Sequence, residues 1–117
     1  MNFESGKEVV MGDVVIGEGN LAGRGVYARR DFHKGEVVIK YNLTPLTQDE
    51  FEALPQEEKM FTHIHHNKVN LYGEPERYVN DSKDPNTRVD REILADVAIR
   101  DIKSGEMITG DSVEDDF

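Results

Sequence analysis

The sequence predicts a mostly β domain of short strands with one small helical insertion, on three observations. Short runs of β-branched residues recur along the chain, separated by glycine or Asx residues that favour turns. A helical pattern occurs only in the middle, at about residues 47–66. The length of 117 residues fits a single domain, residues 1–117, with no linker or repeat to divide it.

The expected strands of the first half are branched runs between glycine turns. They cover residues 9–11, 14–16, 26–28 and 37–39. Gly12-Asp13 separates the first two, and Lys34-Gly35 precedes the fourth. So many strand signals before any helix favour a β core.

The middle of the chain carries helix signals. Thr47 followed by Glu50 matches the capping box, in which hydroxyl and carboxylate each accept a hydrogen bond from the helix's first amides. Pro55 ends that helix and can open a second one. Met60, Phe61 and Ile64 are expected to form the buried stripe of the second helix.

The second half returns to strand signals. They cover residues 69–72, 77–79, 93–99 and 107–109. The run at 93–99 is the strongest, since it is apolar except for Asp96.

Charge and composition narrow the function classes. The net charge of −10 disfavours direct nucleic-acid binding, which needs clustered Lys and Arg, and suits either a basic protein partner or simple solubility. No apolar stretch is long enough to span a membrane, and residues 1–5 lack signal-peptide features. We therefore expect a cytoplasmic protein. The absence of cysteine excludes disulfides and thiolate metal sites.

Residues 23–28 (G-R-G-V-Y-A) formally fit the dinucleotide-binding pattern G-x-G-x-x-G/A. That pattern requires a helix after the glycines, whereas Val26 and Tyr27 favour a strand. A Rossmann site is therefore disfavoured. The glycines still let a ligand approach bare backbone, and a hairpin turn without a ligand is the alternative.

Three other polar segments are candidate sites. Residues 80–86 (N-D-S-K-D-P-N) fail as a calcium loop, because Lys83 stands where an oxygen ligand is required, and composition alone indicates a turn. His63 and His66 could share a helix face as metal ligands, but no third ligand has a suitable spacing. We therefore expect no metal site and solvent-facing histidines. The acidic tail, residues 114–116, is expected to be a solvated end.

Taken in order, these segments resemble the SET-domain family of protein-lysine methyltransferases. The resemblance spans roughly residues 14–112 and rests on residues 23–28, 32–37 (F-H-K-G-E-V), 77–86 (R-Y-V-N-D-S-K-D-P-N) and 99–109 (I-R-D-I-K-S-G-E-M-I-T). In the family the third segment usually reads R-F-x-N-H-S-x-x-P-N. The compact insertion and the lack of cysteine flanks look most like the small stand-alone SET proteins of prokaryotes.

The resemblance implies a β-clip-like SET fold with a pseudoknot-like C-terminal crossing and S-adenosylmethionine as cofactor. The residues that it assigns to cofactor binding are Gly23, Arg24, Gly25, Tyr78, Asn80 and Asp81. Asp81 takes the place of the usual histidine, whose contact with adenine is largely through the backbone. The implied partner is a basic, lysine-containing protein or peptide, and a homodimer is an open alternative.

One departure concerns the implied catalytic group. Where the family typically reads G-E-E-L-T-x-D-Y, this chain has Ser112 in place of the tyrosine. Serine is too short to put its hydroxyl in the same position, so we expect a rate loss of about 10²–10³ unless another group substitutes. Tyr41, Tyr72 and Tyr78 are candidates, with Tyr72 preferred because it leads into the Asn80 segment. The chain continues only five residues past Ser112, which predicts a missing channel wall or one supplied by a partner.

Three hypotheses follow. The first is an active lysine methyltransferase. The second is a catalytically degenerate SET-fold module that binds cofactor or a basic peptide. The third is a structural or oligomerising β domain without a ligand.

Overall fold

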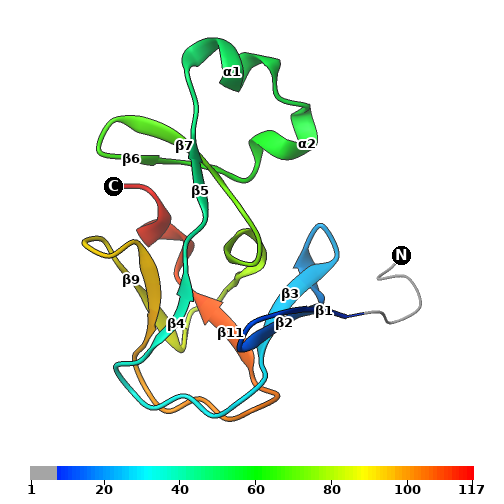
Figure 1. Ribbon diagram of the computed structural model, residues 1–117, viewed down its shortest axis with the longest axis vertical. Helices are drawn as coiled ribbons and strands as arrows, with labels where there is room; N and C mark the ends of the chain where they lie inside the picture. The colour runs from blue at the N-terminus through cyan, green and yellow to red at the C-terminus, as the bar shows by residue number, and fades with distance from the viewer. Residues whose placement is uncertain (1–7) are drawn as a thin grey trace.

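The computed structural model describes residues 8–117, so the N-terminal residues 1–5, expected to lack a signal peptide, lie outside this range. Eleven short strands dominate the described chain (Figure 1). They are β1 (Val9–Met11), β2 (Val14–Leu21), β3 (Arg24–Ala28), β4 (Val37–Lys40), β5 (Leu43–Pro45), β6 (Thr62–His65), β7 (Lys68–Tyr72), β8 (Asn80–Asp81), β9 (Thr87–Asp90), β10 (Ala95–Ala98) and β11 (Met107–Gly110). The mostly β fold is confirmed.

The helices are short. They are α1 (Gln48–Ala53), α2 (Gln56–Lys59) and the 3₁₀ turns η2 (Glu76–Tyr78) and η3 (Ser112–Asp115). The expected capping box is present: Glu50 N donates to Thr47 Oγ1 at 3.1 Å, and Thr47 N donates to Glu50 Oε1 at 2.8 Å. Both α-helices lie at one end of the molecule, above β5, β6 and β7 (Figure 1).

Three small sheets make up the domain. The first has the order β1-β2-β3-β11-β8, the second β4-β10-β9 and the third β5-β7-β6. All pairings are antiparallel except β11 with β8, where Thr109 faces Asn80 in a parallel register. The last strand of the chain therefore lies between β3 and β8, which places residues 80–81 against residues 109–110.

The core lies beneath the first sheet. Ile16, Val26 and Ile108 are fully buried there, and they alternate with more exposed neighbours as expected for a half-buried strand. Phe32 and Ile102 are also buried and exchange backbone hydrogen bonds of 2.8 and 2.9 Å. This bridge joins the two long connections β3–β4 and β10–β11, which run side by side opposite the helices (Figure 1).

Three local expectations were wrong. Residues 62–65 form strand β6 rather than continuing the second helix, because Thr62–His65 pairs along its whole length with β7. Residues 77–79 lie in and after η2 instead of in a strand. The expected strand at 93–99 is limited to Ala95–Ala98, since residues 91–94 form a turn in which Leu94 has a φ of 54°.

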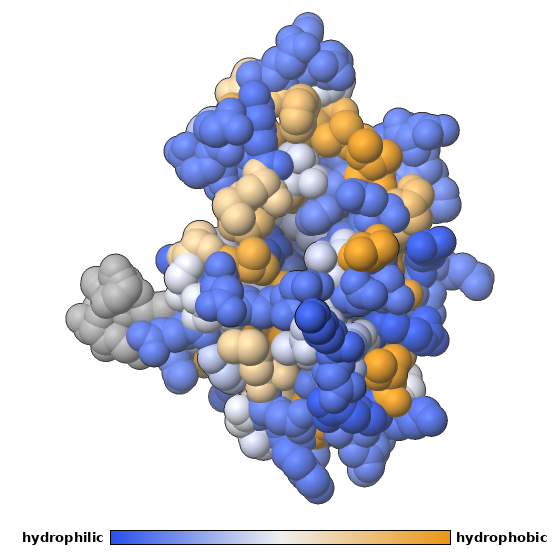
Figure 2. All heavy atoms as spheres, turned by 180° about the vertical axis from the view of Figure 1, so that it is seen from behind, coloured by the Kyte–Doolittle hydropathy of each residue, from blue (hydrophilic) through white to orange (hydrophobic). Residues whose placement is uncertain are grey.

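The face drawn in Figure 2 is mainly hydrophilic. On the face in Figure 2, apolar side chains gather below the helical insertion within an otherwise polar surface. No helix among residues 8–117 is long and apolar enough to cross a membrane.

Candidate functional site

The first part of the site is the hairpin between β2 and β3. Gly23 has a φ of 79°, a conformation that side chains other than glycine rarely adopt, and it faces open space. Gly19 and Gly25 lie where the two strands approach most closely: a Cβ on Gly19 would overlap the Arg24 carbonyl, and one on Gly25 would lie 3.0 Å from the Glu18 oxygen. β3 follows directly, with no helix, so the disfavoured Rossmann alternative is ruled out.

Asn80 fastens this hairpin to the crossing of β8 and β11. Its Nδ2 donates to the carbonyls of Arg24 and Tyr78, both at 2.9 Å, and its Oδ1 accepts from Asn20 N at 2.8 Å. The side chain is 3% exposed. The glycine-bounded segment and residue 80, far apart in sequence, therefore converge, with the Asn80 side chain engaged by main-chain groups.

Asn86 fixes the same crossing from the other side. Its Nδ2 donates to Met107 O at 2.8 Å, and its Oδ1 accepts from Thr109 N at 2.9 Å. At 1% exposure this amide is held almost entirely by β11. Buried amides with both ends satisfied specify one register between segments.

Asp81 and Ser112 meet beside the crossing. Ser112 N donates to Asp81 Oδ1 at 2.8 Å, and this hydrogen bond lowers the pKa of the Asp81 carboxyl. The contact positions the first residue of η3. The Asp81 carboxylate thus holds the start of η3 against β8.

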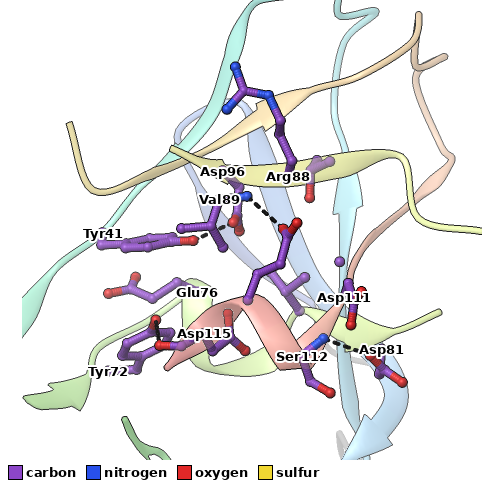
Figure 3. Close-up of a pocket in the computed structure, with 14 residues that line it drawn as sticks. Tyr41, Tyr72, Glu76, Asp81, Arg88, Val89, Asp96, Asp111, Ser112 and Asp115 are labelled. Carbon is purple, nitrogen blue, oxygen red and sulfur yellow. Dashed lines mark hydrogen bonds between the residues drawn. The ribbon is translucent and has the colours of Figure 1, made fainter. Parts of the chain in front are cut away.

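Two cavities lie next to each other at this point. The narrower one has a free volume of about 20 Å³, room for a single water-sized group, and the wider one about 250 Å³. Both are bordered by Tyr72, Glu76, Val79, Asp81, Ser112 and Asp115. The narrow cavity, drawn in Figure 3, also reaches Tyr41, Thr87, Arg88, Val89, Asp96, Gly110, Asp111 and Glu114. The wide cavity is completed by Leu21, Met60, Phe61, His63 and Arg77.

Tyr72 stands in the wall that the two cavities share. Its hydroxyl lies 3.0 Å from His65 Nε2 and 3.4 Å from the Asp115 carbonyl oxygen. Burial and the nearby Asp115 carboxylate raise the pKa of Tyr72, so the phenol keeps its proton at neutral pH. Tyr41 packs against it, with ring centroids 5.3 Å apart.

Among the carboxyls that border the cavities, Glu76 and Asp96 are buried and Asp115 is half-buried. Glu76 is 4% exposed; its Oε2 accepts from Asn42 N and Gly73 N, while its Oε1 is buried without a partner. Burial raises the pKa of Glu76, and it raises the pKa of Asp96 and of Asp115 to about 7 each. Such carboxyls favour a cationic neighbour.

The sequence-based residues fall into two groups. Tyr72, Asp81 and Ser112 border the cavities. Gly23, Arg24, Gly25, Tyr78 and Asn80 are absent from both linings and form the adjoining hairpin and crossing, where the Arg24 guanidinium lies 5.2 Å from the centre of the Tyr78 ring. These roles remain predictions.

Sequence reasoning missed Glu76, Asp96 and Asp115. Asp96 carried a detectable signal, because it is the single charged residue in an apolar run, and a charge buried in a strand needs a partner. Glu76 and Asp115 carried no such signal. Their positions depend on how η2 and η3 pack against the sheets.

The expectation of solvent-facing histidines holds for His66 and was wrong for His65, and the acidic tail is docked instead of ending free in solvent. His65 is 5% exposed on β6, and its Nε2 lies 2.9 Å from the Asp115 carbonyl. Phe117 exchanges backbone hydrogen bonds with Ile64 and His66 and stacks on the His65 ring at 4.1 Å. The tail is therefore docked on β6, and Glu114 and Asp115 line the narrow cavity. Within residues 8–117 no group of His, Asp and Glu side chains could hold a metal ion.

Comparisons with known proteins agree with this architecture. A family model described as SET domain matches residues 23–111. A search of curated proteins returned no significant match.

Solved structures share the fold. A Plasmodium falciparum protein, named for a proposed histone methyltransferase activity, superposes with a TM-score of 0.69 at 18% identity, over 87% of this chain and 94% of that one. The Chaetomium thermophilum polycomb repressive complex 2 bound to S-adenosylmethionine gives a TM-score of 0.68 at 27% identity, over 87% of this chain and 15% of that one. A humanized mutant of the same complex bound to the inhibitor GSK343 gives 0.70 at 26% identity, again over 87% and 15%. With a family match across most of its length and the same fold, this chain belongs to the SET domain family.

Proposed function

We propose that this protein is an S-adenosylmethionine-dependent protein-lysine N-methyltransferase. The observation that carries the proposal is the pair of cavities that share a wall at Tyr72 and Ser112. Methyl transfer from a sulfonium to an amine is an in-line displacement, which requires donor and acceptor to reach one point from opposite sides. Two cavities of unequal size with one common wall suit that requirement.

The wide cavity fits the cofactor chemically. Leu21, Met60 and Phe61 offer apolar surface for an adenine ring. The unpartnered Glu76 Oε1 and the Asp115 carboxyl suit the positive charges of a sulfonium and an α-ammonium group. The cofactor would supply an electrophilic methyl group on sulfur. The residues of this chain would bind it and orient that methyl toward the shared wall.

The narrow cavity fits the end of a lysine side chain. Its volume admits one water-sized group, which is the size of a terminal amine. Carboxyls and two tyrosines surround that space, and the net charge of −10 favours encounter with a basic partner. We therefore propose a basic, lysine-containing protein or peptide as the substrate.

Within this proposal Tyr72 takes over part of the role of the absent tyrosine. Tyr72 borders both cavities, and the hydrogen-bonding distance of its hydroxyl from His65 and the packed Tyr41 ring restrict its orientation. Ser112 borders the same wall with a shorter side chain. A preorganised hydroxyl is worth about 10²–10³ in rate when it acts only in the transition state.

The test combines cofactor binding with methyl transfer. Calorimetry with S-adenosylmethionine and S-adenosylhomocysteine should show binding, and methyl-tritiated cofactor should label a mixture of basic proteins. Tyr72→Phe should lower the transfer rate by about 10²–10³, whereas the matched control Tyr27→Phe, whose hydroxyl bonds the exposed Glu18 carbonyl, should retain it. Absence of binding to both cofactor forms would overturn the proposal.

Ser112 also supports a second candidate, a degenerate module that binds cofactor or basic peptide without turnover. Cofactor binding without label transfer to any protein, together with transfer restored in Ser112→Tyr, would favour that candidate. The cytoplasmic location, the prokaryotic character and a homodimer remain predictions from the sequence.

A further inference from the structure

Asp96 is buried inside β10, and the Tyr41 hydroxyl donates a hydrogen bond to its Oδ1 (Figure 3). Backbone pairing positions the two residues for this contact. β4 and β10 are neighbours, Lys40 pairs with Ala95, and Tyr41 N donates to Leu94 O at 3.0 Å. The tyrosine that follows β4 is thus held beside the carboxyl of the adjacent strand.

The surroundings of Asp96 are acidic. Glu76 from η2 and Glu114 and Asp115 from η3 face it, and the phenols of Tyr41 and Tyr72 complete the lining. Arg88 from β9 borders the same cavity, but it is exposed and its guanidinium points away from the carboxyl (Figure 3). Among the described residues, Tyr41 is the one side chain that hydrogen-bonds to the Asp96 carboxyl.

The protonation state of the Asp96 carboxyl determines the direction in which the Tyr41 O–H points. When Asp96 is a carboxylate, Tyr41 must donate to it, and a lone pair of the Tyr41 oxygen is left for the cavity. When Asp96 is protonated, the acid can donate instead, and the Tyr41 O–H is released toward the cavity. An amine in the cavity meets an acceptor in the first state and a competing donor in the second.

We propose that Asp96 is a positioning residue, which holds the Tyr41 hydroxyl so that its oxygen accepts a hydrogen bond from the substrate amine in the narrow cavity. The inference rests on the proposed function. The free Glu76 Oε1, which borders the same cavity, provides a second acceptor for the amine. Together they orient the amine and leave its nitrogen lone pair for the methyl group.

The test is the pH profile of kcat/KM for methyl transfer to a basic peptide, compared between wild type and Asp96→Asn. Wild-type activity should fall on the acid side as Asp96 takes up its proton. Asp96→Asn should lower kcat at pH 8 by about 10- to 100-fold, the value of one charge-assisted hydrogen bond. Its KM should stay within about twofold, since the amine head is a small part of the peptide's contact area. Glu92→Gln, an exposed carboxylate in the turn before β10, is the charge-matched control and should leave the profile unchanged.

Asp115 titrates in the same cavity, so a double-mutant comparison assigns the effect. Tyr41→Phe removes the hydroxyl that Asp96 is proposed to direct. In the Tyr41→Phe background, Asp96→Asn should change the ratio of kcat/KM at pH 8 to that at pH 6 by less than about twofold. Asp115→Asn should still change it. Equal effects of Asp96→Asn with and without the Tyr41 hydroxyl would overturn the inference, and denaturation curves of each variant exclude unfolding as the cause.

A binding experiment separates this inference from the proposed function. n-Butylamine, a mimic of the lysine side chain, is titrated into the protein saturated with S-adenosylhomocysteine at pH 6 and pH 8. Affinity should rise with pH by about fivefold or more in wild type and by a smaller factor in Asp96→Asn, where Asp115 still titrates in the cavity. If wild type transfers no methyl group, the proposed function fails, and this pH dependence alone decides the role of Asp96. Identical pH dependence in wild type and Asp96→Asn would overturn that role.

Discussion

The Asn80 side chain donates to the carbonyl oxygen of Arg24 at 2.9 Å, across 56 positions of sequence. Together with the bond from Asn20 N to Asn80 Oδ1, this bond ties the glycine-bounded hairpin to the strand that runs beside β11. These bonds bring together two of the four segments on which the SET resemblance rests. The cavities open next to this junction, so its integrity should affect both stability and binding.

Asn80→Ala should therefore destabilise the protein by about 1–3 kcal/mol, because it removes the three hydrogen bonds that the buried Asn80 side chain makes with main-chain groups of Asn20, Arg24 and Tyr78. Urea denaturation measures the loss, and calorimetry should show weaker cofactor binding. Asn42→Ala, which removes an exposed amide, is the control. Equal stability of the two variants would contradict the proposed fastening role.

The two-strand contact at the hairpin gives a second prediction. Gly19→Ala should cost more than about 2 kcal/mol, since the new Cβ would overlap the Arg24 carbonyl and main chain must shift. Gly12→Ala meets no atom within 4 Å and carries only the strain of a positive φ, about 1 kcal/mol. Thermal and chemical unfolding of both variants measures which one loses more stability. A larger loss in Gly12→Ala would show that the positive φ matters more than the close approach of the strands at Gly19.

A third prediction concerns the docked tail. Phe117→Ala removes the ring stacked on His65 and should speed amide hydrogen exchange of residues 113–117 about threefold to tenfold, the equivalent of one aromatic pair. Val113→Ala is the control, because Val113 is 81% exposed and lies in the same segment. Unchanged exchange rates in the Phe117 variant would mean that the backbone hydrogen bonds to β6 hold the tail in place without the stacked ring.

The buried Asp96 predicts a pH-dependent stability. Burial raises its pKa from the ordinary value near 4 to about 7, so between these values the folded protein binds a proton that the unfolded chain lacks. Stability from this group is complete below about pH 4 and is lost as the pH rises through 7. His63 and His65, whose pKa values burial lowers, act in the opposite direction below their ordinary pKa.

Asp96→Asn isolates this effect, because the histidines are the same in both proteins. The free energy of unfolding, measured in urea from pH 4 to pH 8, should decline more steeply in wild type, by roughly one proton released on unfolding. Parallel curves for the two proteins would mean that Asp96 titrates normally in the fold.

Much of the fold could be predicted from local patterns. The runs at 9–11, 14–16 and 69–72 and the Thr47 capping box occur as expected, because strand alternation, glycine turns and helix caps act over a few residues. The order of the motifs along the chain also suffices to identify the family. The local pattern gave a wrong prediction for residues 62–65. Their apolar spacing suits a helix, and only pairing with β7 makes them strand β6.

The sequence alone thus determined the β-rich class and the family, and it predicted Ser112 in place of the family's tyrosine. The tertiary structure decided that Tyr41 and Asp96 share a hydrogen bond, that Glu76 keeps a free buried oxygen, and that the acidic tail lines the narrow cavity. These facts have no local signature. Burial and the meeting of distant side chains depend on how β4, β10, η2 and η3 pack together, and the energy of a buried charge comes from that packing rather than from its sequence neighbours.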